Sequence, residues 1–210
     1  MGRLAKRPSN CSVSAIVLAA GQARRMGELK QLLPWGGATI IEQVVDCVAA
    51  SGMVETVVVV GCKAEAVARK LAAKPVKIEV NANYKGGMSS SLICGLKALE
   101  KKSKGIMVVL GDQPTLEVET LKNLLGAFCR HPAIIVPVYQ KRRGNPVIFP
   151  VKYIKEMLAL NGDRGARTVV EAHPLDVIEI EVDTDSVIRD IDDAKDYKTL
   201  LNRITSKKPR

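Results

Sequence analysis

The chain has 210 residues, of which 47% are hydrophobic and 26% charged, as is typical of a globular protein with one substantial core. Aromatic residues make up only 3%, too few for the stacking platforms that bind single-stranded nucleic acid. The first apolar run begins at Val13 and is short, and no run reaches the ~18 residues of a membrane span. We therefore expect a cytoplasmic protein that binds neither nucleic acid nor membrane.

The net charge of +10 is concentrated at the two ends of the chain. Residues 1–10 and 201–210 contain seven basic residues and no acidic one, which leaves about +3 on the rest. Basic ends can touch nucleic acid or lipid, but such segments are more often solvated. We predict a single domain over residues 11–200, flanked by basic, flexible tails at 1–10 and 201–210.

The five cysteines are odd in number and contain no C-x-x-C pair. This spacing argues against a disulfide framework and against a zinc site. Most of them fall in apolar periodic stretches, so we interpret them as small buried hydrophobic residues.

Short β-branched runs alternate with helical patterns along the chain, which predicts an α/β fold with a mostly parallel sheet. The predicted strands are Val13–Ala20, Glu55–Val60, Val76–Val80, Ile106–Leu110, Ala133–Val138, Asn145–Phe149 and Val177–Val182. The predicted helices are Thr39–Ser51, Lys63–Ala73, Ser90–Lys101, Glu117–Cys129, Val151–Leu160, Ala166–Ala172 and a last one from about Asp193.

A long loop follows the first strand and has the composition of a phosphate-binding loop. Its small residues around Gly21 let backbone N–H groups approach phosphate oxygens closely, and Arg25 and Lys30 add cationic donors. It lacks the glycines and the G-K-[ST] of a Walker A loop or a G-x-G-x-x-G turn. The alternative is an ordinary strand-to-helix loop with surface cations.

Asp112 follows a buried strand directly, which places it at the carboxyl edge of a parallel sheet. Mg²⁺ prefers oxygen ligands and usually takes one or two carboxylates together with substrate phosphates. Asp112 suits that role, although an Asp before Gln-Pro is also common in turns and helix caps. Further along, alternation in Asp190-Ile-Asp192 predicts two carboxylates on one strand face, with a helix cap as the alternative.

Two glycine-rich segments complete the candidate site. Gly86-Gly-Met-Ser-Ser-Ser91 predicts a capped helix start whose free N–H groups can meet an anion or a base edge, or a plain serine cap. Arginines lie beside glycines in Arg143-Gly-Asn-Pro-Val147 and Gly162-Asp-Arg-Gly-Ala-Arg167, which indicates a basic rim for a phosphorylated ligand. Surface arginines in turns are the competing interpretation.

These motifs, in this order, resemble one known family. The pattern Leu18-Ala-Ala-Gly-x-x-x-Arg-Met-Gly-x-x-Lys30 is similar to the opening signature of pyrophosphorylase-type nucleotidyltransferases. From about Val13 to Tyr197 the chain resembles the molybdenum cofactor cytidylyltransferase branch of the MobA-like NTP transferases. The resemblance implies a Rossmann-like three-layer α/β/α sandwich of the glycosyltransferase-A type, with a mostly parallel sheet.

The resemblance also implies roles for individual residues. The implied catalytic residues are Arg25, Lys30 and Asp112, and the implied Mg²⁺ ligands are Asp112, Asp190 and Asp192. The implied nucleotide-binding residues are Leu18, Ala19, Ala20, Gly21, Lys30, Gly87, Ser91 and Asp112. The implied acceptor-binding residues are Arg143, Asn145, Asp163, Arg164 and Arg167.

The function that the resemblance implies is transfer of CMP from CTP to molybdopterin or the molybdenum cofactor, with release of pyrophosphate. Ala20 favours CTP, because the guanylyl branch tends to carry glycine there. A client molybdoenzyme or its chaperone would be a partner. Two alternatives stay open: a cytidylyl- or uridylyltransferase for another phosphorylated acceptor, and a non-catalytic nucleotide-binding partner of a molybdoenzyme.

Overall fold

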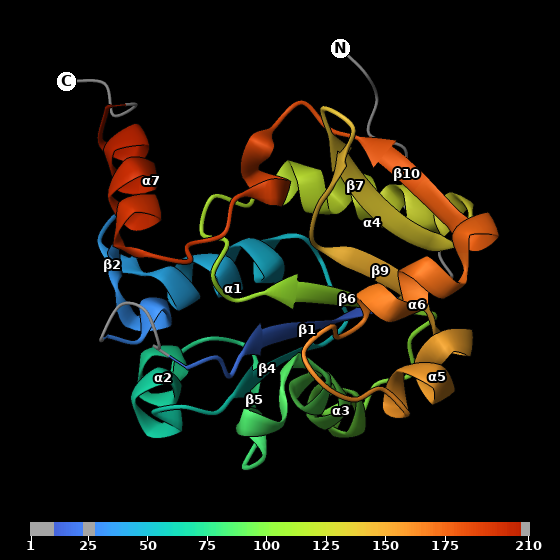
Figure 1. The fold of residues 1–210 in the computed structure, drawn as a ribbon, viewed down its shortest axis with the longest axis horizontal. Coiled ribbons are helices and arrows are strands. Elements are labelled where there is room, and N and C mark those ends of the chain that lie inside the picture. Colours follow the sequence, from blue (N-terminus) through green and yellow to red (C-terminus); the bar gives the residue numbers. More distant parts are fainter. Residues whose placement is uncertain (1–10, 23–27, 207–210) are drawn as a thin grey trace.

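An eight-stranded, mostly parallel sheet lies at the centre of the computed structural model, which describes residues 11–22 and 28–206 (Figure 1). Its strands run in the order β10-β7-β9-β6-β1-β4-β5, with β8 paired to β7. Their bounds are β1 Val13–Ala19, β4 Thr56–Val60, β5 Lys77–Val80, β6 Gly105–Leu110, β7 Ile134–Tyr139, β8 Arg142–Arg143, β9 Val147–Pro150 and β10 Val177–Glu181.

The strand β1 lies in the middle of the sheet and pairs in parallel with both β4 and β6. The register sets Leu18 opposite Leu110. The segments that follow β1 and β6 therefore leave the sheet side by side at the same carboxyl edge. Among the strands described in this sheet, only β9 and the short β8 run antiparallel to their neighbours. This topology brings the first loop and Asp112 together, as expected for neighbouring parallel strands.

Helices cover both faces of the sheet (Figure 1). The core on one face contains side chains of α1 (Ile40–Ala50), α2 (Ala64–Leu71) and α4 (Val118–Arg130). The core on the other face contains α3 (Met88–Ala98), α5 (Ile154–Leu158) and α6 (Arg167–Ala172). The predicted three-layer α/β/α sandwich is confirmed. No helix within the described ranges is long and apolar enough to cross a membrane.

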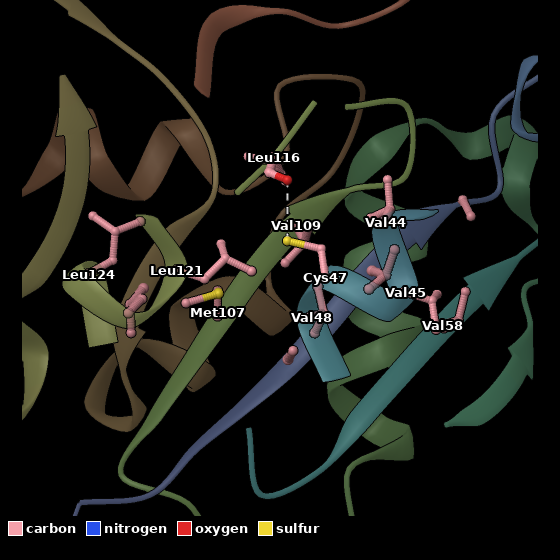
Figure 2. Close-up of a cluster of buried hydrophobic side chains, with 14 of the residues drawn as sticks. Val44, Val45, Cys47, Val48, Val58, Met107, Val109, Leu116, Leu121 and Leu124 are labelled. Carbon is pink, nitrogen blue, oxygen red and sulfur yellow. Dashed lines mark hydrogen bonds between the residues drawn. The ribbon is translucent and has the colours of Figure 1, made fainter. Parts of the chain in front are cut away.

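The α1 and α4 side of the core shows how the sequence pattern produces these layers (Figure 2). Val48 of α1 and Leu121 of α4 pack against the inward-facing Met107 and Val109 of β6, and all four side chains are fully buried. Cys47 is buried with them and its thiol donates to the Leu116 carbonyl at 3.3 Å. Burial raises the pKa of Cys47 to about 12, so this cysteine stays protonated and unreactive, as predicted for a small core residue.

The C-terminal helix α7 (Ala194–Ser206) stands apart from the sheet, beside the hairpin of β2 (Pro34–Trp35) and β3 (Ala38–Thr39) (Figure 1). Leu200 and the partly buried Leu201 pack on Trp35 in a third apolar cluster. The helix α7 continues to Ser206, beyond the expected domain boundary at residue 200. The tail residues 1–10 and 207–210 lie outside the described residues.

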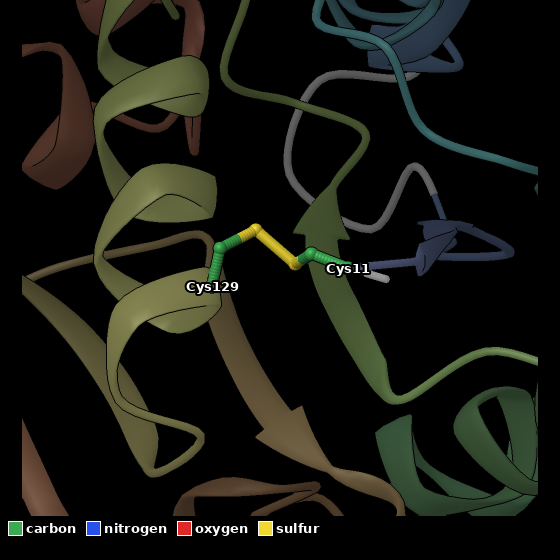
Figure 3. Close-up of a disulfide and its surroundings, with 2 residues drawn as sticks. All are labelled: Cys11 and Cys129. Atoms are coloured by element: carbon green, nitrogen blue, oxygen red, sulfur yellow. A yellow bond between two sulfur atoms is a disulfide. The ribbon is translucent and has the colours of Figure 1, made fainter. Parts of the chain in front are cut away.

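The spacing of the cysteines argues against disulfides, and this prediction is wrong. Cys11, just before β1, and Cys129, in the last turn of α4, form a disulfide across 118 residues of sequence (Figure 3). The other three cysteines are free. Pairing over such a separation depends on how α4 packs beside the start of β1, which cysteine spacing does not encode.

We expect Gly95→Ala to lower the free energy of unfolding by about 1–2 kcal/mol. A Cβ at Gly95 in α3 would lie 2.5 Å from Ile16 Cγ2 and 2.9 Å from Val59 Cγ2. Overpacking costs about 1–3 kcal/mol, which exceeds the gain of at most about 1 kcal/mol in helix propensity. Urea unfolding of both proteins measures the difference.

The matched control is Gly126→Ala in α4, where the added Cβ would first meet the flexible Arg130 side chain at 3.5 Å. We expect this variant to gain about 0.5–1 kcal/mol from helix propensity. Equal stabilisation of both variants would contradict the close packing of α3 on β1 and β4.

Candidate functional site

An ion pair between Lys30 and Asp112 lies at the carboxyl edge of β1 and β6. Gly111 lets the segment after β6 lie close to the end of β1. Its N–H donates to the Leu18 carbonyl at 2.9 Å, and a Cβ at Gly111 would lie only 2.9 Å from that oxygen. Asp112 follows at once, and Lys30 Nζ lies 2.5 Å from its Oδ2. Lys30 Nζ also lies 3.4 Å from Asp192 Oδ1. Both Lys30 and Asp112 side chains are only 18% exposed, so the pair is poorly screened by solvent.

The pKa values of Lys30 and Asp190 are both shifted by burial and by the neighbouring charges. Burial lowers the pKa of Lys30, but the carboxylates of Asp112 and Asp192 outweigh it and hold the pKa above its ordinary value. Partial burial raises the pKa of Asp190, and the negative charges of Asp192 and Asp112 add to this while Lys30 opposes it. The cluster therefore keeps a charged lysine and favours any further cation.

The segment Asp190–Asp192 reaches the site without forming the predicted strand. It is irregular chain between a 3₁₀ helix at Asp185–Ile188 and α7. Ile191 is fully buried and its N–H donates to the Asp112 carbonyl at 3.1 Å. Both carboxylates line the same cavity as Asp112. The segment is held in place by the buried Ile191 side chain and by the hydrogen bond from the Ile191 N–H, and not by pairing in a sheet.

The oxygens of this cluster fit a hard divalent cation. Asp112 Oδ1 is buried and has no hydrogen-bond partner among the described residues, an arrangement that is costly unless a ligand compensates it. Within the same part of the chain, no three His, Cys, Asp or Glu side chains come together as a ready metal site. A Mg²⁺-like ion held by one or two carboxylates, with substrate phosphates completing its shell, needs no such preformed cage.

A cavity of about 380 Å³ opens beside the ion pair. Most of the predicted nucleotide-binding residues line it: Leu18, Ala20, Gly21, Lys30, Gly87, Ser91 and Asp112. Ala19 does not, because its side chain is fully buried in the core on the α1 side. Arg25 lies outside the described residues. The sequence interpretation missed Gln22, Gln31, Tyr84, Lys85, Met88 and Leu110, which also line the cavity.

All five predicted acceptor-binding residues line a second cavity of about 520 Å³: Arg143, Asn145, Asp163, Arg164 and Arg167. Its walls include apolar side chains of β6, β7, β9 and α6, namely Val108, Val136, Val147, Phe149 and Val170. Its arginines are paired with carboxylates: Arg143 Nε lies 2.7 Å from Glu179, Arg167 Nε lies 3.1 Å from Glu171, and Arg164 also contacts Glu171. An anionic ligand would compete with these exposed pairs, which are individually weak.

The two cavities are neighbours, and three residues line both: Met88, Leu110 and Asp163. Ser89 N–H, at the start of α3, donates to the Gly162 carbonyl at 3.0 Å. Gly87 has a φ of +90°, and a Cβ there would lie 2.5 Å from Asp163 Oδ1. Only glycine fits both the backbone angle and this approach. Two ligands, one in each cavity, would therefore meet near Asp163.

Comparisons with known sequences identify the family of this chain. A model of the MobA-like NTP transferase domain matches residues 15–177. Nicotine blue oxidoreductase of Paenarthrobacter nicotinovorans is 32% identical over 198 residues, which are 90% of this chain and 96% of that protein. Molybdenum cofactor cytidylyltransferase of Escherichia coli is 23% identical over 195 residues, which are 92% of this chain and 98% of that enzyme.

Solved structures give the same result. The crystal structure of Rv0371c from Mycobacterium tuberculosis is 29% identical, covers 92% of this chain and 100% of its own, and superposes with a TM-score of 0.83. The complex of Rv0371c with manganese superposes with a TM-score of 0.79 and covers 91% of this chain and 98% of its own. This chain is a nucleotidyltransferase and belongs to the MobA-like NTP transferase family.

Proposed function

We propose that this protein transfers CMP from CTP to the terminal phosphate of molybdopterin or the molybdenum cofactor, with Mg²⁺ and with release of pyrophosphate. The observation that carries the proposal is the Lys30–Asp112 pair at one side of a cavity that adjoins a second one lined by arginines. In the described part of the chain, the buried Oδ1 of Asp112 has no hydrogen-bond partner. The first cavity would hold the nucleotide and the second the acceptor. The E. coli relative is named for this activity.

The reaction is an in-line displacement at the α-phosphorus of the NTP. A phosphate oxygen of the acceptor forms the new bond to the α-phosphorus, and the bond to the β-phosphate oxygen breaks, so pyrophosphate leaves with that electron pair. No protein nucleophile takes part. Catalysis of this kind depends on positioning and on neutralising the charge that builds up on the leaving group. Adjacent cavities that share Asp163 would supply the positioning.

In the proposal, Lys30 and Arg25 neutralise the negative charge that builds up on the leaving pyrophosphate. Lys30 lies beside Asp112, where it stays charged. Asp112 and Asp190, with Asp192 close by, would hold Mg²⁺, which when bound offsets phosphate charge as a Lewis acid. The manganese complex of the 29% identical neighbour supports a divalent cation in this family.

The second cavity suits a flat heterocycle that carries a phosphate. Its walls are apolar, and Asn145 and three arginines provide polar contacts at its margin. Arginine is well suited to bidentate phosphate contact. A molybdopterin-type acceptor fits this chemistry, and a client molybdoenzyme or its chaperone would receive the product.

Three other functions compete with the proposal. The acceptor can be a different phosphorylated molecule, or the protein can bind nucleotide without turnover. The 32% identity to a nicotine blue oxidoreductase favours a third, reduction of a dye-like substrate. Dye reduction by NADH or NADPH without any pyrophosphate release would favour this third function.

The deciding experiment incubates the protein with Mg²⁺, molybdopterin and each NTP in turn and measures pyrophosphate. We expect release with CTP and at least tenfold less with GTP, because the Ala20 methyl lines the nucleotide cavity and would leave less room for a purine than a glycine there. Faster release with GTP would contradict the base preference. Release of pyrophosphate from CTP with a sugar phosphate, but not with molybdopterin, would contradict the proposed identity of the acceptor.

We expect Lys30→Met to lower kcat at saturating CTP by ~10²–10³ and to change the Kd for CTP only modestly. The ammonium would meet more negative charge as pyrophosphate departs than it meets in bound NTP, so its loss acts mainly on the transition state. Steady-state kinetics and calorimetric titration measure the two effects separately.

Lys74→Met is the matched control for this variant. It removes a lysine that pairs at 2.7 Å with Asp46 on the surface, and kcat should stay within twofold of the parent. If Lys30→Met also keeps kcat within a few-fold, Lys30 is a structural partner of Asp112 and not a catalytic residue.

A further inference from the structure

Asn81 is a buried amide that lies directly behind the nucleotide cavity. It follows β5, is 5% exposed, and its backbone N–H donates to the Val60 carbonyl at 2.8 Å. Its side-chain Oδ1 accepts from the Asn83 N–H at 2.9 Å. Its Nδ2 donates to Ser90 Oγ at 2.9 Å and to Ser91 Oγ at 3.0 Å. Every hydrogen-bonding atom of the amide group therefore has a partner.

These contacts fix which way the amide faces. A flip of Asn81 would set its NH₂ group against the Asn83 N–H, donor against donor, so the two amide hydrogens must face the serines. The Ser90 hydroxyl donates to the carbonyls of Asn83 and Gly87, both at 2.8 Å. Ser91 accepts from Asn81 in the same way, but no described residue accepts its hydroxyl hydrogen.

Ser91 differs from Ser90 in one further respect: it lines the nucleotide cavity, together with Ala20, Tyr84 and Gly87. Its Oγ is already an acceptor on the Asn81 side, so its hydrogen is free to point into the cavity. The hydroxyl therefore presents a donor there, and a ligand atom that accepts a hydrogen bond is its complement.

We propose that Asn81 is a positioning residue that holds Ser91 as a hydrogen-bond donor and thereby selects cytosine over uracil. The two pyrimidines have the same size, but N3 is an acceptor in cytosine and an N–H donor in uracil. A fixed donor at Ser91 matches the first and opposes the second. This inference rests on the proposed function, in which the first cavity holds the nucleotide.

Asn81→Asp tests the mechanism because it reverses the polarity with almost no change in shape. The carboxylate still accepts from the Asn83 N–H, and it now also accepts from the Ser91 hydroxyl, which turns that hydrogen away from the cavity. Calorimetric titration with Mg²⁺ and either CTP or UTP, without acceptor, gives the ratio of the two Kd values. We expect the preference for CTP to fall about tenfold, the size of one reversed hydrogen bond in a buried setting. The added negative charge weakens both nucleotides alike and cancels in the ratio.

Two further variants keep the test decisive if Asn81→Asp fails to fold. Ser91→Ala removes the donor without adding charge, and we expect the same loss of preference. Ser90→Ala removes the other serine contact of Asn81 but nothing that lines the cavity, and the preference should stay within twofold of the parent.

The outcomes separate this inference from the proposed function. Loss of preference in Asn81→Asp and Ser91→Ala, with Ser90→Ala unchanged, supports the inference. A parent protein that binds CTP and UTP equally, or a preference that survives in Ser91→Ala, overturns the inference and leaves the nucleotide site standing. A parent that binds neither nucleotide overturns the proposed function, and the inference with it.

Discussion

The parallel pairing of β1 with β6 is the constraint on which the site depends. Because Leu18 lies opposite Leu110, the loop after β1 and the acid after β6 leave the sheet at one edge. Gly111 removes the side chain that would keep them apart. Lys30 then reaches Asp112 across this edge, and the Ile191 N–H bonds to the Asp112 carbonyl to bring in the last acidic segment. The catalytic geometry of the proposal follows from one β ladder, one glycine and one buried isoleucine.

The charges of the nucleotide cavity explain why the proposed chemistry calls for a divalent cation. Among the described residues that line it, four are acids and two are lysines. A triphosphate entering such a cavity would be repelled unless further positive charge came with it. Magnesium brings that charge on the nucleotide itself, and the buried Oδ1 of Asp112 is an available ligand. In the proposal, Lys30 would then be released from Asp112 toward the phosphates, and the ion pair would be the state of the site without nucleotide.

Local sequence was enough to predict most of the elements, and most of the predicted site residues gather around the two cavities. Buried strands such as β4 and β6 are continuous apolar runs, and glycines beside acids or arginines mark the loops that follow them. Contacts between distant segments were not predictable in this way. Asn81 lies in no recognisable motif, and its contacts with Ser90 and Ser91 appear only when β5 and α3 are packed together. The Cys11–Cys129 disulfide and the Arg143–Glu179 pair likewise depend on tertiary placement.

A crystal structure with Mn²⁺ and a non-hydrolysable CTP analogue would locate the proposed metal site, because the anomalous signal of manganese identifies the ion. We expect a peak at about 2.0–2.3 Å from a carboxylate oxygen of Asp112, with phosphate oxygens completing the shell and Lys30 turned from Asp112 to the phosphates. A nucleotide bound elsewhere, or an ion that leaves the Lys30–Asp112 contact intact and Oδ1 unpartnered, would contradict this proposal.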